Sequence, residues 1–453
     1  MLGNLLNFVE PLLNMISIGR TDNSQVNIAG LGLGMTYLLA VNYTLGLGLS
    51  QGIQTFISQS YGKGDFHMVG VYLWRGRLLL CLTQIPFAVS LFFSYYSFKF
   101  IGIQEEQALV ASEFCKASVY TVFIRQQMHL ERYFLNSLQM NKAQTLFIFI
   151  TIALHPLWLY FWVVRYDLGV TGVAIATSTT FTIELLLFLF YEYKWVDQGH
   201  PIKKMLIWPK LNELHPKDLW EQFVFGFHCF LMVAILIWAF EALIVFSSLL
   251  KNQSETSASV LWYQVEYMGF VIVRSISTAS GALIGFEIGA RNPAEAKRIA
   301  RVSRNLVLSF TLFLVLVIYY VSPYLASLYS QDQDIKEKFV RISWAVLIAM
   351  ASDCLLGIYF SFIKALGQQK KTTKFAIFSQ MFLGIPSQAL FGFYFGLGSE
   401  GFWLGLASGN FLTCLCFVIM LFHYFDWNKI SDDTFERLQL AKIEKDEKEK
   451  LIN

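Results

Sequence analysis

The second half of the chain repeats the pattern of the first half at a shift of about 228 residues. Three motifs recur at this spacing: Gly62–Asp65 at Gly289–Asn292, Lys142 at Lys370, and Leu168–Gly172 at Leu397–Gly401. Each half is mostly apolar and divides into about six long hydrophobic segments. Many secondary transporters are built from two copies of one membrane unit. The repeat therefore predicts a carrier across a bilayer, with a site where the halves meet.

Composition places the chain in a membrane. Only 15% of its 453 residues are charged and 55% are hydrophobic, whereas soluble proteins carry about 25% charged residues. Spans of about 20 residues with short loops leave room for eleven or twelve helices. The net charge of +3 is too small to indicate nucleic acid. The six cysteines show no CxxC pairing, so we interpret them as small core residues and expect no metal or organic cofactor.

The hydrophobic segments predict an all-α polytopic membrane protein with about twelve transmembrane helices. We place them at 3–18, 29–60, 78–98, 107–134, 142–164, 169–192, 219–249, 258–288, 303–328, 337–365, 374–396 and 401–425. The first covers barely two thirds of a bilayer at 1.5 Å per residue. Either the bilayer thins around it or the chain begins inside helix 1, and we favour the second reading.

Lysines and arginines predict the orientation. Eighteen lie in or beside the loops on one side and seven on the other, which sets the first side, and with it both termini, in the cytoplasm. Residues 196–218, rich in lysine and proline, have the composition of a linker. The expected domains are a lobe at 1–195, this linker, a lobe at 219–426 and a charged tail at 427–453. Because each lobe has an even number of spans, the two repeats are parallel.

Two acids lie in the middle of apolar segments and are candidates for proton coupling. Glu241 follows Ile237 and Trp238, and Asp353 lies in a run of alanine, methionine and leucine. Charges at such depth cost about 2.5 kcal/mol or more and usually serve function. An apolar setting favours the neutral carboxylic acid, which can then hold a proton near neutral pH. The alternative is two structural acids hydrogen-bonded to helix backbones or hydroxyls.

Other polar and aromatic residues have two readings each. Arg274 either binds an anionic substrate or pairs with an acid such as Glu266, and Glu266 itself faces away from Gln264 on a helix. His155 precedes Pro156 in a span and either titrates or makes a plain hydrogen bond. Four aromatic residues near the acids either line a cavity or anchor helix ends. They are Trp238, Phe240, Tyr267 and Tyr359.

Several motifs together resemble the multidrug and toxic compound extrusion (MATE) family, and more closely its eukaryotic branch. The match runs from about Ile16 to Phe425, and the order and spacing of its short motifs carry it. The motifs are Gly48–Gln51 with Gln59–Gly62, Trp238–Glu241, Glu287–Pro293, Asp353 with Gly367–Lys370, Gly384–Pro386, and Gly396–Gly398 with Gly401.

The resemblance implies two six-helix lobes in a V around a central cleft. It also implies a monomeric antiporter that exports organic, often cationic, compounds in exchange for protons, with sodium as the alternative ion. In this family further acids are common where this chain has Leu236, Gln54 and Gln264. Glutamine binds polar ligands but cannot hand over a proton. We therefore assign Glu241 and Asp353 to protons and Gln54 and Gln264 to substrate, and leave room for neutral or anionic substrates.

Three alternatives stay open at this stage. A lipid or lipid-linked headgroup flippase of related fold would have a more basic lumen, for which Arg274 is the one hint. A membrane receptor or scaffold without flux would have no need of mid-membrane acids. An enzyme is the least favoured reading, because the sequence shows no His/Asp/Glu cluster with metal spacing and no serine with an evident base beside it.

Overall fold

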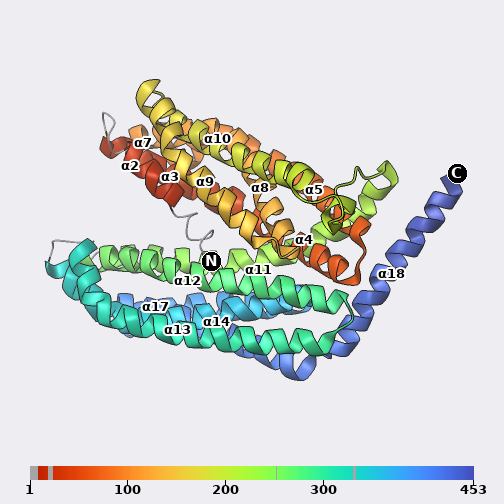
Figure 1. Ribbon diagram of the computed structural model, residues 1–453. Coiled ribbons are helices and arrows are strands. Elements are labelled where there is room, and N and C mark those ends of the chain that lie inside the picture. The colour runs from red at the N-terminus through yellow and green to blue at the C-terminus, as the bar shows by residue number, and fades with distance from the viewer. Residues whose placement is uncertain (1–8, 19–23, 251–252, 330–332, 453) are drawn as a thin grey trace. The chain divides into compact units, whose positions relative to one another are not determined.

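The computed structural model describes residues 9–18, 24–250, 253–329 and 333–452, and throughout these stretches the ordered structure is helical (Figure 1). The chain divides into two compact units, Leu2–Phe230 and Leu231–Asn453. The boundary falls inside helix α11, twelve residues beyond the start of the second predicted lobe at 219. Each unit has its own hydrophobic core.

The N-terminal unit contains the first six spans and the loop that follows them. Its elements are α2 (Val9–Ile18), α3 (Ser24–Tyr37), η1 (Leu38–Tyr43), α4 (Thr44–Lys63), α5 (Phe66–Phe92), α6 (Ser94–Ile101), α7 (Glu105–Ala117), α8 (Val119–Ser137), α9 (Asn141–Leu159), η2 (Tyr160–Arg165), α10 (Gly169–Phe190), η3 (Tyr191–Trp195), η4 (Pro201–Lys204), η5 (Leu211–Leu214) and the start of α11 (Pro216–Leu249).

The C-terminal unit contains the rest of α11 and six further helical segments. These are α12 (Gln253–Gly289), α13 (Pro293–Tyr329), α14 (Gln333–Ala365), the run α15 (Gln369–Phe378), η6 (Ser379–Gly384), α16 (Ile385–Ala389) and η7 (Leu390–Tyr394), then α17 (Ser399–Ile419) with η8 (Met420–Tyr424), and α18 (Trp427–Ile452). Helix α14 lies at the centre of this unit and packs against α12, α13 and α17, as Figure 1 shows.

The helical segments confirm the predicted all-α membrane fold. Ten described helices are long and apolar enough to cross a bilayer. The predicted span at 107–134 is a helix pair, α7 and α8, interrupted at Ser118. The predicted span at 3–18 appears as the ten-residue α2, and its first six positions lie outside the described residues. Several helices are longer than predicted because charged turns such as Pro293–Val302 extend the apolar spans.

The backbone repeats along with the sequence, because residues with positive φ recur at the same shift. Non-glycine residues rarely adopt this conformation, and here each of three has a glycine as its counterpart. The matched positions are Gly64 (+80°) with Arg291 (+62°), Gln139 (+62°) with Gly367 (+70°), Asp167 (+51°) with Gly396 (+67°), and Gly169 (+50°) with Gly398 (+59°). The two units therefore share their turns as well as their helices.

The same tight turn starts a helix in each unit. Asp65 Oδ1 accepts a hydrogen bond from the backbone N–H of Met68, and Asn292 Oδ1 accepts one from Glu295. Such side-chain caps satisfy one of the unpaired N–H groups at a helix start. Asp65 and Asn292 are themselves counterparts in the repeat.

The predicted linker is fixed to the N-terminal unit. Trp74 donates a hydrogen bond to the carbonyl of Ile207 at 2.6 Å, and its ring contacts Trp208. Arg75 Nε donates to the carbonyl of Glu213 at 2.7 Å, and its Nη2 pairs with Asp218 at 2.5 Å. This segment therefore packs against α5.

The charged tail forms helix α18, and its first turns are docked on the C-terminal unit. Ser431 Oγ donates to the carbonyl of Ile288 at 3.0 Å, and Asp432 pairs with Arg291 at 2.7 Å. Trp427 Nε1 donates to the carbonyl of Leu421. The first turns of the charged tail are therefore helical and pack on this unit.

Candidate functional site

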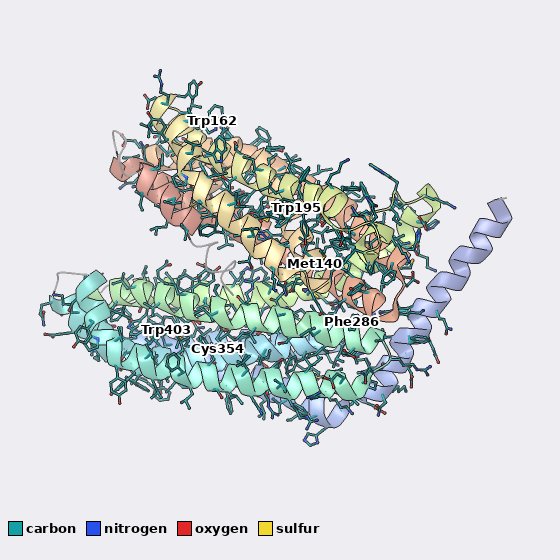
Figure 2. All side chains as sticks on the ribbon, viewed as in Figure 1. Met140, Trp162, Trp195, Phe286, Cys354 and Trp403 are labelled. Atoms are coloured by element: carbon teal, nitrogen blue, oxygen red, sulfur yellow. The ribbon has the colours of Figure 1, made fainter. Side chains whose placement is uncertain are left out.

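Two buried acids meet inside the C-terminal unit. Glu266 on α12 and Asp353 on α14 are each 2% exposed, and their carboxyl groups lie within hydrogen-bonding reach of one another. Figure 2 labels Cys354, the residue after Asp353, inside this bundle. The pair is the most deeply buried acidic contact of the unit and forms the centre of the candidate site.

A close approach of α12 and α14 brings these acids together. Gly269 lies one turn beyond Glu266, and a Cβ at this position would come 2.9 Å from Leu314 Cδ2 on α13 and 3.1 Å from Met350 Sδ on α14. Met350 in turn lies one turn before Asp353. A larger residue at 269 would force the side chains of Leu314 and Met350 to shift beside the acids.

Two carboxyls in one apolar site cannot both ionise at low cost, so such pairs hold one proton between them. Glu266 Oε1 is buried and makes no hydrogen bond in the described structure, which leaves an acceptor unused. Arg274, about two turns further along α12, is within electrostatic range of Asp353. The site is therefore suited to bind and release a single proton.

Glu241 on α11 and the acid pair lie near the same tyrosine, Tyr263. Tyr263 on α12 is within electrostatic range of Glu241, Glu266 and Tyr267. Its ring stacks on Tyr267 with centroids 6.4 Å apart and meets the edge of Phe240 at 5.8 Å. The structure thus brings Glu241, Phe240 and Tyr267 to the same region as the acid pair.

In the structure the buried acid of α12 is at a different position from the one expected. The family resemblance places an acid where this chain has Gln264, and Glu266 was expected to face away from Gln264. In the structure Gln264 is exposed, and Glu266 is the buried residue that faces Asp353. The two residues do face different ways, as expected, but Glu266 faces the site. Arg274 is within electrostatic range of Asp353, and both readings of this arginine stay predictions.

The remaining predicted substrate residues are spread more widely. Trp238 is 45% exposed, whereas Tyr359 is buried and packs its ring edge-on against Phe362. Gln54 belongs to α4 of the N-terminal unit, where its side chain is buried and its Nε2 has no hydrogen-bond acceptor among the described residues. Their roles in binding substrate stay predictions.

A second polar network is buried in the N-terminal unit, and its acid was missed at the sequence level. Glu10 on α2 accepts hydrogen bonds from Asn14 at 2.6 Å and from Thr177 at 3.1 Å. His155 Nε2 bonds Asn14 Oδ1 at 2.9 Å, and its Nδ1 bonds Thr180 at 2.8 Å. The reading of His155 as a hydrogen-bonded residue is confirmed. Glu10 was overlooked because α2 is short, although an acid in an apolar segment was signal enough.

Another buried acid of this unit has a structural role. Glu184 on α10 makes two hydrogen bonds to Arg132, at 2.6 Å from Nε and 2.7 Å from Nη2. Thr151 Oγ1 lies 3.4 Å from the same carboxylate. This bidentate pair ties α8 to α10 and leaves Glu184 neutralised by its partner. Among the described residues no group of three or more His, Cys, Asp or Glu could hold a metal ion.

Comparison with known proteins explains the duplicated architecture. The MatE family matches residues 1–161 and again residues 229–390, so the same family unit occurs twice at an offset of 228 residues. The chain belongs to the MATE family. This MATE protein is therefore a multi-pass membrane transporter, and its repeat is the family's own duplication.

Curated relatives extend over nearly the whole MATE chain. Protein DETOXIFICATION 48 of Arabidopsis thaliana is 24% identical over 440 residues, which cover 96% of this chain and 80% of that protein. Protein DETOXIFICATION 16 of the same plant is 23% identical over 446 residues, covering 98% and 90%.

Solved structures share the fold. The crystal structure of the eukaryotic MATE transporter AtDTX14 superimposes with a TM-score of 0.88 at 17% identity, over 96% of each chain. The outward-facing form of a multidrug resistance MATE transporter superimposes with a TM-score of 0.82 at 16% identity, over 96% of this chain and 94% of that one. This MATE chain thus has the fold of these solved structures.

Proposed function

We propose that this MATE transporter exports small organic compounds in exchange for protons, with Glu266 and Asp353 as the coupling pair and Glu241 as the third acid. The observation that carries the proposal is the contact between two buried carboxyls on α12 and α14. When both carboxyls are ionised they repel each other in this apolar site, so the contact is stable only while the pair holds a proton.

The shared proton gives the pair two states. With one proton, the carboxyls hydrogen-bond to each other and α12 stays against α14. Without it, two negative charges face each other, and the helices must separate or a cation must approach. Proton and substrate then need only favour different conformations for their movements to be coupled.

The substrate side of the proposal rests on the residues near the acids. Phe240, Tyr263 and Tyr267 present aromatic surface beside Glu241, and such rings bind planar organic compounds and cations. Gln54, Gln264, Trp238, Tyr359 and Arg274 remain the further predicted contacts. The chain would work as a monomer with both termini in the cytoplasm, as the distribution of lysine and arginine indicates.

Uptake into liposomes tests this proposal. Protein reconstituted into vesicles with an imposed pH gradient should accumulate a fluorescent rhodamine ester, a delocalised organic cation. Asp353→Asn and Glu266→Gln should abolish the gradient-dependent part of the uptake, because neither variant keeps a pair that can exchange a proton. The matched control is Glu295→Gln, which removes an exposed acid paired with Arg298 at the start of α13.

The outcomes separate the alternatives. Gradient-dependent uptake in the wild type and the control, with none in either pair variant, supports proton coupling through the pair. Equal gradient-dependent uptake in the wild type and both pair variants would place the coupling elsewhere, with the Glu10 network of the N-terminal unit as the next candidate.

A further inference from the structure

The N-terminal unit contains an arginine whose charge the transport proposal does not use. Arg125 lies on α8, and its guanidinium stands 4.1 Å from the ring centroid of Tyr43 on η1 and 5.2 Å from that of Phe181 on α10. Both rings are buried. The guanidinium is therefore inside the helix bundle, between η1 and α10, and the two aromatic faces hold it there.

This arginine differs from the other buried arginines of the same unit. Arg75, Arg77 and Arg132 each pair with a carboxylate, those of Asp218, Glu131 and Glu184. No carboxylate of the described residues lies within ion-pair distance of Arg125, and its Nε is buried without a hydrogen-bond acceptor. A cation at this depth is costly and is usually paired or used to bind a ligand.

The nearest candidate counter-ion is already engaged. Glu10 acts electrostatically on Tyr43, as Arg125 does, but its carboxylate accepts hydrogen bonds from Asn14 and Thr177. Tyr43 itself hydrogen-bonds Arg125 through its hydroxyl. The residues that contact the guanidinium of Arg125 are thus neutral, and no carboxylate of the described residues forms an ion pair with it.

Buried amides elsewhere in the same helix bundle also have hydrogen-bonding groups without a partner. Gln126, the next residue on α8, is 1% exposed, and neither its Oε1 nor its Nε2 has a partner in the described structure. Asn42, next to Tyr43, donates to Gln84 Oε1 at 2.5 Å, which leaves Gln84 Nε2 without an acceptor. Unpaired buried amides cost stability unless a ligand or water satisfies them.

We propose that Arg125 binds the carboxylate of an organic anion, so that carboxylate-bearing compounds are among the substrates. The guanidinium can donate two parallel hydrogen bonds to a carboxylate, a geometry that lysine and glutamine do not offer. The inference rests on the transport function proposed above and names a substrate class for it. It also fits Gln54 of the same unit, a neutral residue where the family often has an acid.

Binding to purified protein in lipid nanodiscs tests the inference without transport. The probes are a fluorescent coumarin carboxylate and the matching coumarin carboxamide, which differ in charge and little else. The wild type should bind the carboxylate at least tenfold more tightly than the carboxamide. Arg125→Gln should remove this preference, Arg125→Lys should keep part of it, and Arg165→Gln, at an exposed position at the end of η2, should leave it intact.

Three results would overturn the inference. They are equal affinity of the wild type for the two probes, no binding of the carboxylate at all, and an unchanged preference in Arg125→Gln. Rhodamine uptake under a pH gradient, measured on the same preparations, reports separately on the proposed proton antiport. Rhodamine uptake without a preference for the carboxylate probe would reject the anion site alone. A preference for the carboxylate probe without rhodamine uptake would reject proton-driven export alone. Uptake in Arg125→Gln also shows that this variant is folded.

Discussion

At the scale of single residues, we expect Glu266 and Asp353 to act as one acid rather than as two. Their carboxyls share an apolar site between α12 and α14, so in the proposed mechanism removal of either group removes the proton that the pair exchanges. Residues that act as a unit show strongly non-additive effects.

The first prediction concerns this pair. Glu266→Gln, Asp353→Asn and the double variant should lose gradient-driven rhodamine uptake to the same extent, each to below about one tenth of wild type. Initial uptake rates in liposomes measure it. Two independent acids would give a different result: the uptake rate of the double variant would fall below that of each single variant by about the factor that separates the single variant from wild type.

The second prediction concerns the ion pair that ties α8 to α10. Replacing one partner, as in Arg132→Met or Glu184→Met, leaves a buried charge unpaired and should lower the free energy of unfolding by about 3–5 kcal/mol. The double variant Arg132→Met, Glu184→Met should recover most of this loss. Thermal unfolding in detergent measures both, and a double variant less stable than each single variant would contradict the structural role.

Sequence reasoning at this scale found single charges but not their partners. Asp353 and Glu241 stand out because each interrupts an apolar run. The partner of Asp353 is 87 residues away along the chain, and only the packing of α12 on α14 selects Glu266 over Gln264. Nothing in the sequence shows the two rings that enclose the guanidinium of Arg125.

At the scale of elements, the predicted linker packs on a helix of the N-terminal unit. The residues 196–218 have linker composition, yet four side-chain contacts hold the segment on α5. Composition predicts solvent exposure of a loop, but it does not show which aromatic or arginine side chains will bind its carbonyls.

The third prediction tests this attachment. Trp74→Ala removes both the hydrogen bond to Ile207 and the ring contact with Trp208, so trypsin should cleave after Lys203, Lys204 or Lys210 severalfold faster. Trp220→Ala, which changes an exposed tryptophan on α11, is the control. Equal cleavage rates in wild type and Trp74→Ala would show that the contacts do not hold the segment.

The fourth prediction uses two glycines that occupy the same place in the repeat. A Cβ at Gly172 would come 2.6 Å from the carbonyl oxygen of Trp162, and one at Gly401 would come 2.5 Å from the carbonyl carbon of Phe391. Alanine at either position should destabilise its unit by about 1–3 kcal/mol, because backbone must move to admit a methyl group. Gly199→Ala, with nothing within 4 Å, should leave the melting temperature unchanged. Unchanged melting temperatures of Gly172→Ala and Gly401→Ala would contradict the close packing at these positions.

The helices themselves were largely predictable, and their breaks were not. Long apolar runs predicted most helix ends to within a few residues of their observed positions. The break at Ser118 and the π-helical turns that follow Pro156 and precede Pro386 depend on local hydrogen bonding, which hydropathy does not report. The ends of helices were underestimated wherever charged turns such as Pro293–Val302 continue them.

At the scale of the whole molecule, one ancestral unit appears twice, and the copies have diverged in chemistry. Turn residues and capping residues repeat at the shift of the sequence. The buried polar groups do not: the C-terminal unit has the pair Glu266 and Asp353, whereas the N-terminal unit has Glu10 with His155 and the unpaired Arg125. We infer that the C-terminal unit handles the proton and that the N-terminal unit contributes to substrate choice.

The most direct test of proton coupling through the acid pair runs the exchange backwards. Vesicles loaded with a rhodamine ester and a pH-sensitive dye start with no pH gradient, and the outward substrate gradient should then drive protons inward. Coupling between two ligands is reciprocal, so the wild type should acidify the lumen while Asp353→Asn and Glu266→Gln should not. Substrate loss without acidification in the wild type, or equal acidification in the variants, would contradict the account.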